Sequence, residues 1–210
     1  EYFGKPIDAY YKKDGDSFAD VCRMALTEYG QIQNRVDVFE ADLLARANRL
    51  GSKYADIISL AYRQAIAAHK LTWDGEEIQF FSKECYSNGC IATVDVTYPS
   101  IPLFLLYNPD LVCGMLNPIF KYASSGAWPF PYAPHDVGQY PLANGQVYGL
   151  DRSTDTLQPD KQMPVEECGN MLICVAAVCK AKGEYTYARK HRCLLQQWAD
   201  YLVQNGLDPQ

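Results

Sequence analysis

The first third of the chain carries apolar residues at three- and four-residue spacing, which is the pattern of amphipathic helices. One such stretch covers residues from about 17 to 30, and a second runs from about 35 to 50. Gly51 ends the second stretch as a C-cap glycine does, and Ser52 is placed to cap a third helix that continues to about Lys70. Helices of this length joined by a short loop predict an antiparallel helical hairpin.

The pattern changes between residues 71 and 98. Two short β-rich runs, Ile78–Phe81 and Ile91–Val96, are separated by turn-forming residues and predict a small β excursion near residues 77–96. The helical pattern resumes near Ser100, where prolines break it into short pieces or occupy first turns.

Residues 126–163 show no periodicity and are rich in proline, glycine and aromatic residues. A loop of that length within a compact domain is uncommon and usually functional. Two helices follow, at about 164–182 and 184–205. The first is apolar nearly all round from Met171 to Cys179, which predicts a helix buried on every side. These patterns together predict a mainly α-helical fold.

Composition and charge exclude several classes of protein. The 210 residues are 48% hydrophobic and 21% charged, as in an ordinary globular domain, and their formal net charge is −6. Because no cluster of Lys and Arg offsets this charge, nucleic acid and anionic membranes are poor candidates for partners. No apolar stretch approaches the roughly 20 residues of a membrane span. The chain opens with Glu1 and without a signal peptide, so we expect a mature protein or an excised piece of one.

Eight cysteines are many for this length, but their spacing does not predict a metal site. No C-x-x-C occurs, and neither Cys85 with Cys90 nor Cys174 with Cys179 has a partner pair at zinc-finger spacing. We therefore expect no metal and no cofactor. The even number permits disulfides, which the sequence cannot assign.

Two adjacent glutamates are the first candidates for catalysis. Pro164 fits the first position of a helix, so Glu166 and Glu167 fall in its first turn. Neighbouring helical residues point about 100° apart, so at most one glutamate faces a site squarely. Without desolvation the helix N-terminus keeps a carboxylate ionised, which suits a general base or a ligand for an ammonium group. Acids in a first turn are also good helix starters, but the apolar helix behind them places this pair at the mouth of a cleft.

Another carboxylate, Asp95, stands among the β-forming residues Thr93–Tyr98, either exposed on a half-buried strand or buried and paired for a purpose. His135 and Asp136 lie in the long loop, where polar residues often belong to sites. Their adjacency alone does not show that the two side chains meet.

The remaining candidates are weaker. His69 and His191 lie in helical stretches beside Lys, so we expect both to be solvated. Aromatic residues of the long loop, Trp128 among them, would form a stacking floor for a sugar or a flat amide, or would pack into the core. The acids of residues 151–160 do not match the calcium loop of an EF-hand. No motif of a serine hydrolase, a phosphate loop or a dinucleotide fold is present.

Several longer motifs, in one order, resemble the glutaminase A family. They are Ser87–Ser100, Pro102–Pro109, Gly114–Phe120, Ala133–Gly145 and Met163–Met171. The resemblance covers most of the chain and is strongest from about residue 80 to 206. Residues 151–162 look like an insertion relative to shorter members.

The resemblance implies an (α/α)6 toroid of six helical hairpins, which follows a β-rich domain in a secreted or periplasmic protein. Residues 1–210 would then be the N-terminal part of this six-hairpin domain, with about half of the barrel present, in a fragment of a larger multidomain protein. The open face of such a partial toroid would be free to bury itself against another copy, and the fragment alone would lack one wall of its cleft.

The resemblance also implies L-glutamine hydrolysis. Among the positions that match the family's acidic motifs, we expect one carboxylate, Glu167 first and Glu166 second, to activate water, with Asp95 as a further catalytic residue. The residues expected to bind the substrate are His135, Asp136, Asn170, Tyr98 and Trp128.

Three hypotheses stay open at this point. The first is an amidohydrolase that releases ammonia from L-glutamine. The second is a glycoside hydrolase on the same toroid, which would hold two carboxylates about 6.5–9.5 Å apart if it inverts. The third is a non-catalytic helical module that binds a glycan or a partner, for which the carboxylates would be dispersed and solvent-facing.

Overall fold

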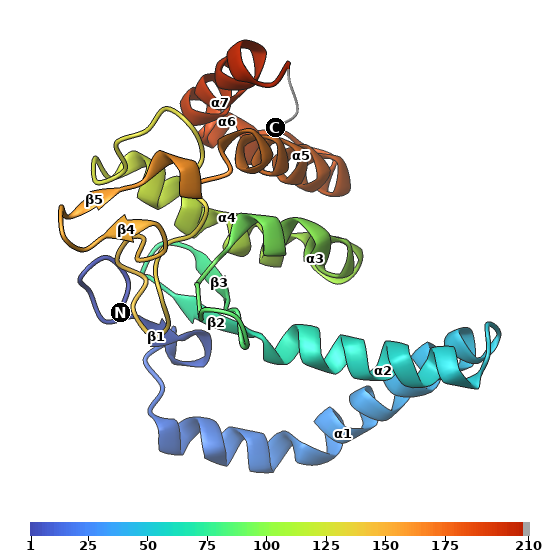
Figure 1. The fold of residues 1–210 in the computed structure, drawn as a ribbon. Helices are drawn as coiled ribbons and strands as arrows, with labels where there is room; N and C mark the ends of the chain where they lie inside the picture. Colours follow the sequence, from blue (N-terminus) through green and yellow to red (C-terminus); the bar gives the residue numbers. More distant parts are fainter. Residues whose placement is uncertain (208–210) are drawn as a thin grey trace.

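Helical hairpins dominate the computed structural model, which describes residues 1–207 (Figure 1). The helices are α1 (Phe18–Asn48), α2 (Ser52–Ala67), α3 (Val94–Tyr107), α4 (Pro109–Ser124), α5 (Pro164–Lys182), α6 (Thr186–Lys190) and α7 (Arg192–Asn205). Figure 1 shows the pair α1–α2 at one side, α3–α4 in the middle, and α5 with α7 at the other side. The predicted mainly helical class is confirmed, and the arrangement is consistent with a six-hairpin helical domain.

The first helix is longer than predicted. Ser17 and Asp20 form a reciprocal capping box at its start, and the helix then continues without a break where the sequence predicted two helices at 17–30 and 35–50. No proline interrupts this stretch, and Gly30 alone costs a helix interior only about 1 kcal/mol. The predicted hairpin is confirmed, but Ser52 does not cap α2, because Gly51 takes the N-cap position with a φ of 124°.

A small antiparallel sheet lies between the first two hairpins. It contains β1 (Asp8–Ala9), β2 (His69–Trp73) and β3 (Ile78–Ser82) in the order β1-β2-β3. The predicted β-rich run at 78–81 is confirmed as a strand. The run at 91–96 forms no strand, because Ile91 makes only an isolated bridge to Lys83 and α3 begins at Val94. Asp74 makes a tight turn by accepting hydrogen bonds from the backbone of Glu76 and Glu77, and this turn pairs β3 with the strand directly before it.

The prediction for His69 is wrong as well. The sequence places it in a solvated helix, but it begins β2 and is only 9% exposed. Its ring stacks on Phe80 with centroids 4.6 Å apart, and Nδ1 lies 2.7 Å from the carbonyl oxygen of Ala65.

Helix α4 packs against β3 and against α5, and the hydrophobic core lies in these two interfaces. Its largest fully buried side chains include Trp198, Phe104, Phe120, Met115 and Leu116. Gly114 lets α4 approach the sheet closely, because a Cβ atom there would lie 2.9 Å from the Cγ2 atom of Ile78. The packed sheet and helices thereby fix the start of α3 and α5, where the acidic residues lie.

The expectation that α5 is buried on every side is wrong for the described residues. Met171, Cys174 and Val178 are fully buried, but Ile173 is 51% exposed on the opposite face. The helix therefore has a covered side against α3, α4 and α7 and an open apolar stripe. Among residues 1–207 all eight cysteines are free thiols, and no helix is long and apolar enough to cross a bilayer.

The long loop 126–163 is irregular, as predicted, with only the short hairpin of β4 (Leu150–Asp151) and β5 (Thr156–Leu157) and one 3-10 turn, η2 (Pro159–Lys161). One part of it is held by the first residues of the chain. The backbone nitrogen of Phe3 donates to the carbonyl oxygen of Ala143 at 3.0 Å, and that of Gly4 donates to Oδ1 of Asn144 at 3.0 Å. Tyr2, only 3% exposed, anchors the contact in the core.

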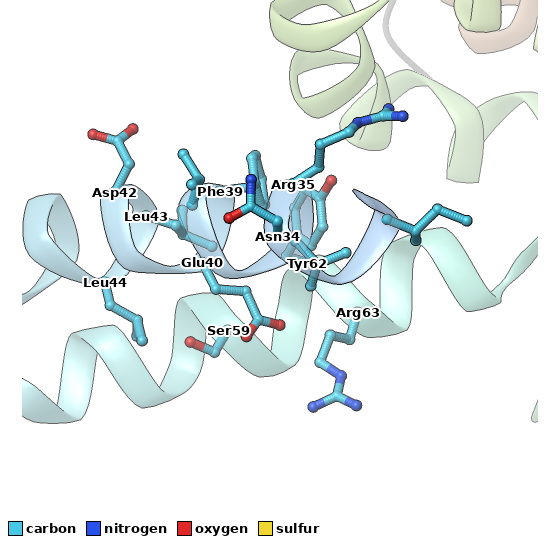
Figure 2. Close-up of a pocket in the computed structure, with 13 residues that line it drawn as sticks. Asn34, Arg35, Phe39, Glu40, Asp42, Leu43, Leu44, Ser59, Tyr62 and Arg63 are labelled. Atoms are coloured by element: carbon cyan, nitrogen blue, oxygen red, sulfur yellow. The ribbon is translucent and has the colours of Figure 1, made fainter. Parts of the chain in front are cut away.

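The hairpin α1–α2 differs from the others because much of its apolar surface is uncovered. The groove between its helices is lined by apolar and aromatic side chains, Phe39, Leu43, Leu44 and Tyr62 among them (Figure 2). Aromatic contacts of Phe39 and Tyr62 with Tyr107 connect the hairpin to the end of α3.

Candidate active site

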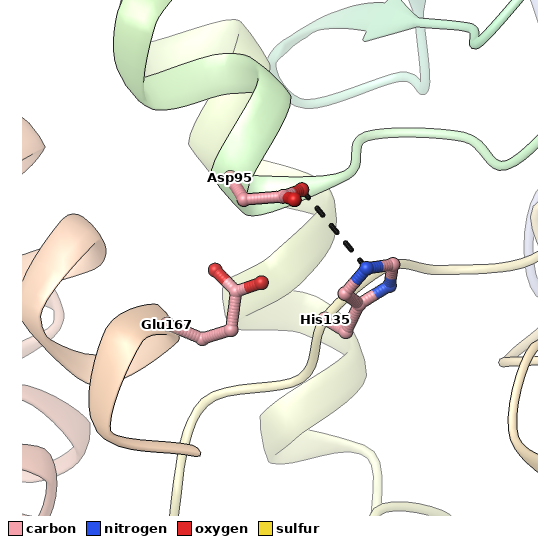
Figure 3. Close-up of side chains that lie close together, drawn as sticks. All are labelled: Asp95, His135 and Glu167. Atoms are coloured by element: carbon pink, nitrogen blue, oxygen red, sulfur yellow. Dashed lines mark ion pairs between the residues drawn. The ribbon is translucent and has the colours of Figure 1, made fainter. Parts of the chain in front are cut away.

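Two carboxylates and one imidazole converge on a common space. Asp95, His135 and Glu167 come from α3, the long loop and α5, and their side chains point toward one another (Figure 3). Each offers one oxygen or nitrogen atom, and these three atoms all lie within 4.8 Å of one another. Oδ1 of Asp95 is 4.0 Å from Nε2 of His135.

Asp95 lies in the first turn of α3, and not on the strand that the β-forming residues around it predicted. Ala92, with a φ of 56°, turns the chain from the sheet into this helix. The Asp95 side chain is 33% exposed to solvent. Its Oδ1 atom, however, is buried and has no hydrogen-bond partner in the described residues. The carboxylate therefore has one side toward solvent and one side toward His135.

The backbone around His135 is bound to the start of α3. The nitrogen of Val94 donates to the carbonyl oxygen of His135 at 2.9 Å. Ile91 donates to Gly138 at 2.9 Å and accepts from Val137 at 3.1 Å, so the two segments pair like short strands. These bonds fix the imidazole relative to Asp95.

Asp136 orients the imidazole of His135. Its Oδ2 atom lies 2.8 Å from Nδ1 of His135, and its Oδ1 atom accepts a hydrogen bond from the backbone nitrogen of Gly138 at 2.8 Å. Asp136 is fully buried, and Tyr148 stacks on the imidazole with ring centroids 4.8 Å apart. The two neighbouring side chains therefore do meet, and the Nε2 atom of His135 is left to face the common space.

His135 and Asp136 each shift the pKa of the other. Burial lowers the pKa of His135, but the hydrogen bond and the charge of Asp136, with Asp95 and Glu84 beyond it, more than offset burial, so the pKa is raised. Burial raises the pKa of Asp136, and the hydrogen bond to His135 opposes that rise.

Glu167 is, with Asp136, one of two fully buried acids of the site. Met163 takes a left-handed conformation with a φ of 46° before Pro164 opens α5, and this turn directs Glu167 inward. Its side chain is fully buried, and neither carboxylate oxygen makes a hydrogen bond within residues 1–207. Burial, reinforced by the charges of Asp95 and Glu166, raises the pKa of Glu167 to about 9. The sequence predicted an ionised carboxylate at this helix N-terminus on the condition that it stays solvated. Glu167 is buried, so that condition is not met.

The other predicted residues divide into those near the space and those outside it. Glu166 is exposed, as expected if only one of the two glutamates faces inward. Asn170, one turn after Glu167, is near enough to oppose the rise in the pKa of Glu167, although its amide nitrogen is buried without a hydrogen bond. Tyr98, one turn after Asp95, is 40% exposed.

Trp128 does not fit its predicted role in binding substrate. It is only 6% exposed, and its Nε1 atom donates to the carbonyl oxygen of Tyr132 at 2.7 Å. Its ring packs against Tyr122, Phe130 and Tyr132. The aromatic residues at this end of the long loop therefore build core and not a stacking floor.

Sequence reasoning missed two residues of the site. Glu84 accepts a hydrogen bond from the hydroxyl of Thr93 at 3.0 Å and adds negative charge beside His135. Tyr148 lies among the aromatic residues of the long loop, and its stacking on His135 depends on how the loop folds. No local pattern marks either residue, since both reach the site through contacts between distant segments.

The site has a strongly negative character. Among the residues that the structure describes, no Lys or Arg forms an ion pair with Asp95, Asp136, Glu167 or Glu84. A water molecule or a cationic group bound there would meet two carboxylates and an imidazole at once. Such a set can accept a proton at one atom and donate one at another, which is the requirement of general acid–base hydrolysis.

Comparison with known proteins points to one family. Residues 51–210 match the family model described as the glutaminase A six helical-hairpin domain. The chain is similar to glutaminase A of Aspergillus oryzae, with 39% identity over 160 residues, which cover 76% of the chain and 22% of that protein. It is also similar to a protein of Arthroderma benhamiae named Probable glutaminase, with 38% identity over 133 residues, or 62% of the chain and 14% of that protein. No solved structure matches the chain significantly.

Proposed function

Because the chain belongs to the glutaminase A six helical-hairpin family, we propose that its site hydrolyses the side-chain amide of L-glutamine and releases ammonia. The observation that carries the proposal is the convergence of Asp95, His135 and Glu167 within 4.8 Å. Amide hydrolysis needs a group that takes a proton from the attacking water and a group that returns one to the leaving nitrogen. The three side chains supply both within reach of one bound molecule.

The positions of these groups suggest how the work is divided. Asp95 is the member with exposure to solvent, so it meets the incoming water. Glu167 lies at the closed end of the space, where the amide of a bound substrate would be held and its nitrogen would leave. His135, fixed by Asp136, presents Nε2 beside Asp95 and would move the proton between water and substrate.

The geometry gives less support to the alternative functions. The oxygens of Asp95 and Glu167 lie within 4.8 Å, which is shorter than the roughly 6.5–9.5 Å of an inverting glycosidase and near the roughly 5–5.5 Å of a retaining one, so the spacing argues against inversion only. Trp128 is buried and does not line a sugar groove. A non-catalytic module would show dispersed, solvent-facing carboxylates, whereas Glu167 is buried and faces its two neighbours.

The two relatives are much longer than the region that they share with this chain. The chain spans 22% and 14% of the lengths of the two curated relatives, both of which are named as glutaminases. The substrate of this chain, its action as a hydrolase and a secreted or periplasmic location therefore belong to the proposal.

The test is the release of ammonia from L-glutamine by the full-length protein, with D-glutamine, L-asparagine and a panel of aryl glycosides measured in parallel. We expect ammonia from L-glutamine and no release of aryl alcohol from the glycosides. A folded protein that cleaves a glycoside and leaves L-glutamine intact would overturn the proposal.

A further inference from the structure

We propose that Asp95, His135 and Glu167 bind one divalent transition-metal ion, of the zinc or manganese type. As a statement about catalysis this inference rests on the proposed function, but the binding itself can be tested without any substrate. It departs from the expectation of no metal, which was drawn from the spacing of the cysteines. The ligands proposed here contain no sulfur.

The donor atoms of the three side chains lie close together. The three atoms lie within 4.8 Å of one another, and Oδ1 of Asp95 is 4.0 Å from Nε2 of His135. Two ligands bound at about 2.1 Å to one ion lie at most about 4.2 Å apart. In tetrahedral geometry the ligand atoms lie about 3.4 Å apart, so side-chain rotations of the two carboxylates would have to draw all three atoms closer together when an ion binds.

His135 is held as a metal ligand is. Metal-binding histidines usually give their other ring nitrogen to a carboxylate or a backbone carbonyl, which fixes the tautomer and leaves a lone pair for the ion. Asp136 does this at 2.8 Å from Nδ1, and the backbone of Gly138 in turn holds Asp136. This arrangement directs Nε2 at Asp95 and Glu167 (Figure 3).

The buried carboxylate oxygens also point to a cation. Both oxygens of Glu167 and Oδ1 of Asp95 are buried without a hydrogen-bond partner among the described residues. Buried acids in native proteins are normally paired, hydrogen-bonded or bound to metal. Since no Lys or Arg in the described part of the chain pairs with them, a bound cation accounts for the arrangement.

The donor set indicates which cations fit. Mg²⁺ and Ca²⁺ prefer sites built of oxygen alone, whereas an imidazole beside carboxylates suits Zn²⁺ and Mn²⁺. Three protein ligands with a position open toward solvent are typical of catalytic rather than structural zinc. The partly exposed side of Asp95 provides that opening. An ion there would hold Nε2 of His135, so it would replace the proton transfer assigned to that nitrogen in the metal-free site, and it would polarise the amide or a bound water in the proposed hydrolysis.

A substrate ammonium group is the competing occupant, and the test separates the two. The full chain is stripped with a chelator and titrated calorimetrically with MnCl₂ and ZnCl₂, and metal content is measured after dialysis. We expect one Mn²⁺ per chain, no binding by His135→Ala, binding weakened about 10–100-fold by Asp136→Asn, and unchanged binding by Glu28→Gln, which alters an exposed acid of α1. Mn²⁺ is the primary probe because exposed thiols such as Cys22 and Cys193 attract zinc.

Circular dichroism and thermal unfolding check that each variant folds, and His135→Gln gives a second variant if His135→Ala does not. Absence of Mn²⁺ and Zn²⁺ binding, or equal binding by wild type and both His135 variants, would overturn the metal site. Stabilisation by ammonium or L-glutamine but by neither metal would assign the space to the substrate instead. Metal binding without ammonia release would leave the site standing and reject only the proposed function, and ammonia release without metal binding would do the reverse.

Discussion

The Nε2 atom of His135 lies 4.0 Å from Oδ1 of Asp95, across the junction between the long loop and the first turn of α3. The same junction is bonded through the backbone, because the nitrogen of Val94 donates to the carbonyl oxygen of His135. The distance between the two side chains is therefore set by main-chain pairing and not by side-chain conformation alone. This makes the site sensitive to changes in the backbone that leave the reactive groups untouched.

Glu167→Gln is expected to lower the rate of ammonia release from L-glutamine by about 100-fold or more, which is typical for the loss of a general acid–base group. Its thermal midpoint should stay the same or rise, because the replacement puts a neutral amide in place of a buried acid without partners. Glu166→Gln is the matched control on the neighbouring exposed residue and should keep its activity. Equal rates in both variants would remove Glu167 from the mechanism.

Gly138→Ala should destabilise the loop that holds Asp136 and lower the free energy of unfolding by about 2–4 kcal/mol. Gly138 has a φ of 136°, and an added Cβ atom would lie 2.4 Å from the carbonyl oxygen of Leu142. Gly126→Ala is the control, because Gly126 also has a positive φ, 75°, but has open space around it and should lose only about 1 kcal/mol. Urea unfolding of the two variants measures the difference, and similar losses would contradict the steric argument.

Val175→Asp and Ile173→Asp test the two faces of α5. Val175 is 3% exposed, so an aspartate there buries an unpaired charge and should cost about 4 kcal/mol or more. Ile173 is 51% exposed, and the same substitution should cost about 1 kcal/mol in the 210-residue chain. Soluble yield and thermal midpoint are the readouts. A normally folding Val175→Asp variant would contradict the observed packing of α5.

His191 should contribute a loss of stability as the pH falls from about 6.5 toward 4. Its ring stacks on Phe120 with centroids 3.7 Å apart, and burial, with the charge of Lys190, lowers its pKa to about 4. At this group the unfolded chain binds more protons than the folded one within that window, so the contribution of His191 to the free energy of unfolding decreases as the pH decreases. The pKa of His69 is lowered as well, again by burial, and adds to the same trend.

His191→Phe keeps an aromatic ring on Phe120 and removes the titrating group. Its stability at pH 7 should match that of the wild type, and its loss of stability between pH 7 and 4.5 should be smaller. Chemical unfolding at a series of pH values measures both. A variant with an unchanged pH dependence would show that other groups control this range.

The sequence predicts the helices well and the site only in part. Periodic apolar positions predicted the hairpins, and Pro164 correctly placed both glutamates in the first turn of α5. Asp95 was placed on a strand because Thr, Val and Tyr around it favour β structure, but the pairing of residues 91 and 94 with the loop, and the packing of the apolar side of α3, outweigh that preference. The contacts of Glu84 and Tyr148 with the site join segments that no periodic pattern relates.

The bonds between residues 1–4 and residues 143–144 have a consequence for the order of folding. They join positions 140 apart in the sequence, so they must close a long loop before they contribute any stability. Contacts within the α3–α4 hairpin join residues that are near in sequence. Such contacts generally form faster than those between distant residues. We therefore expect refolding to give the helices first and the segment that carries His135 last. Pulsed hydrogen exchange would then show late protection at Val94 and Ala143, whose amides are bonded only once that segment is in place.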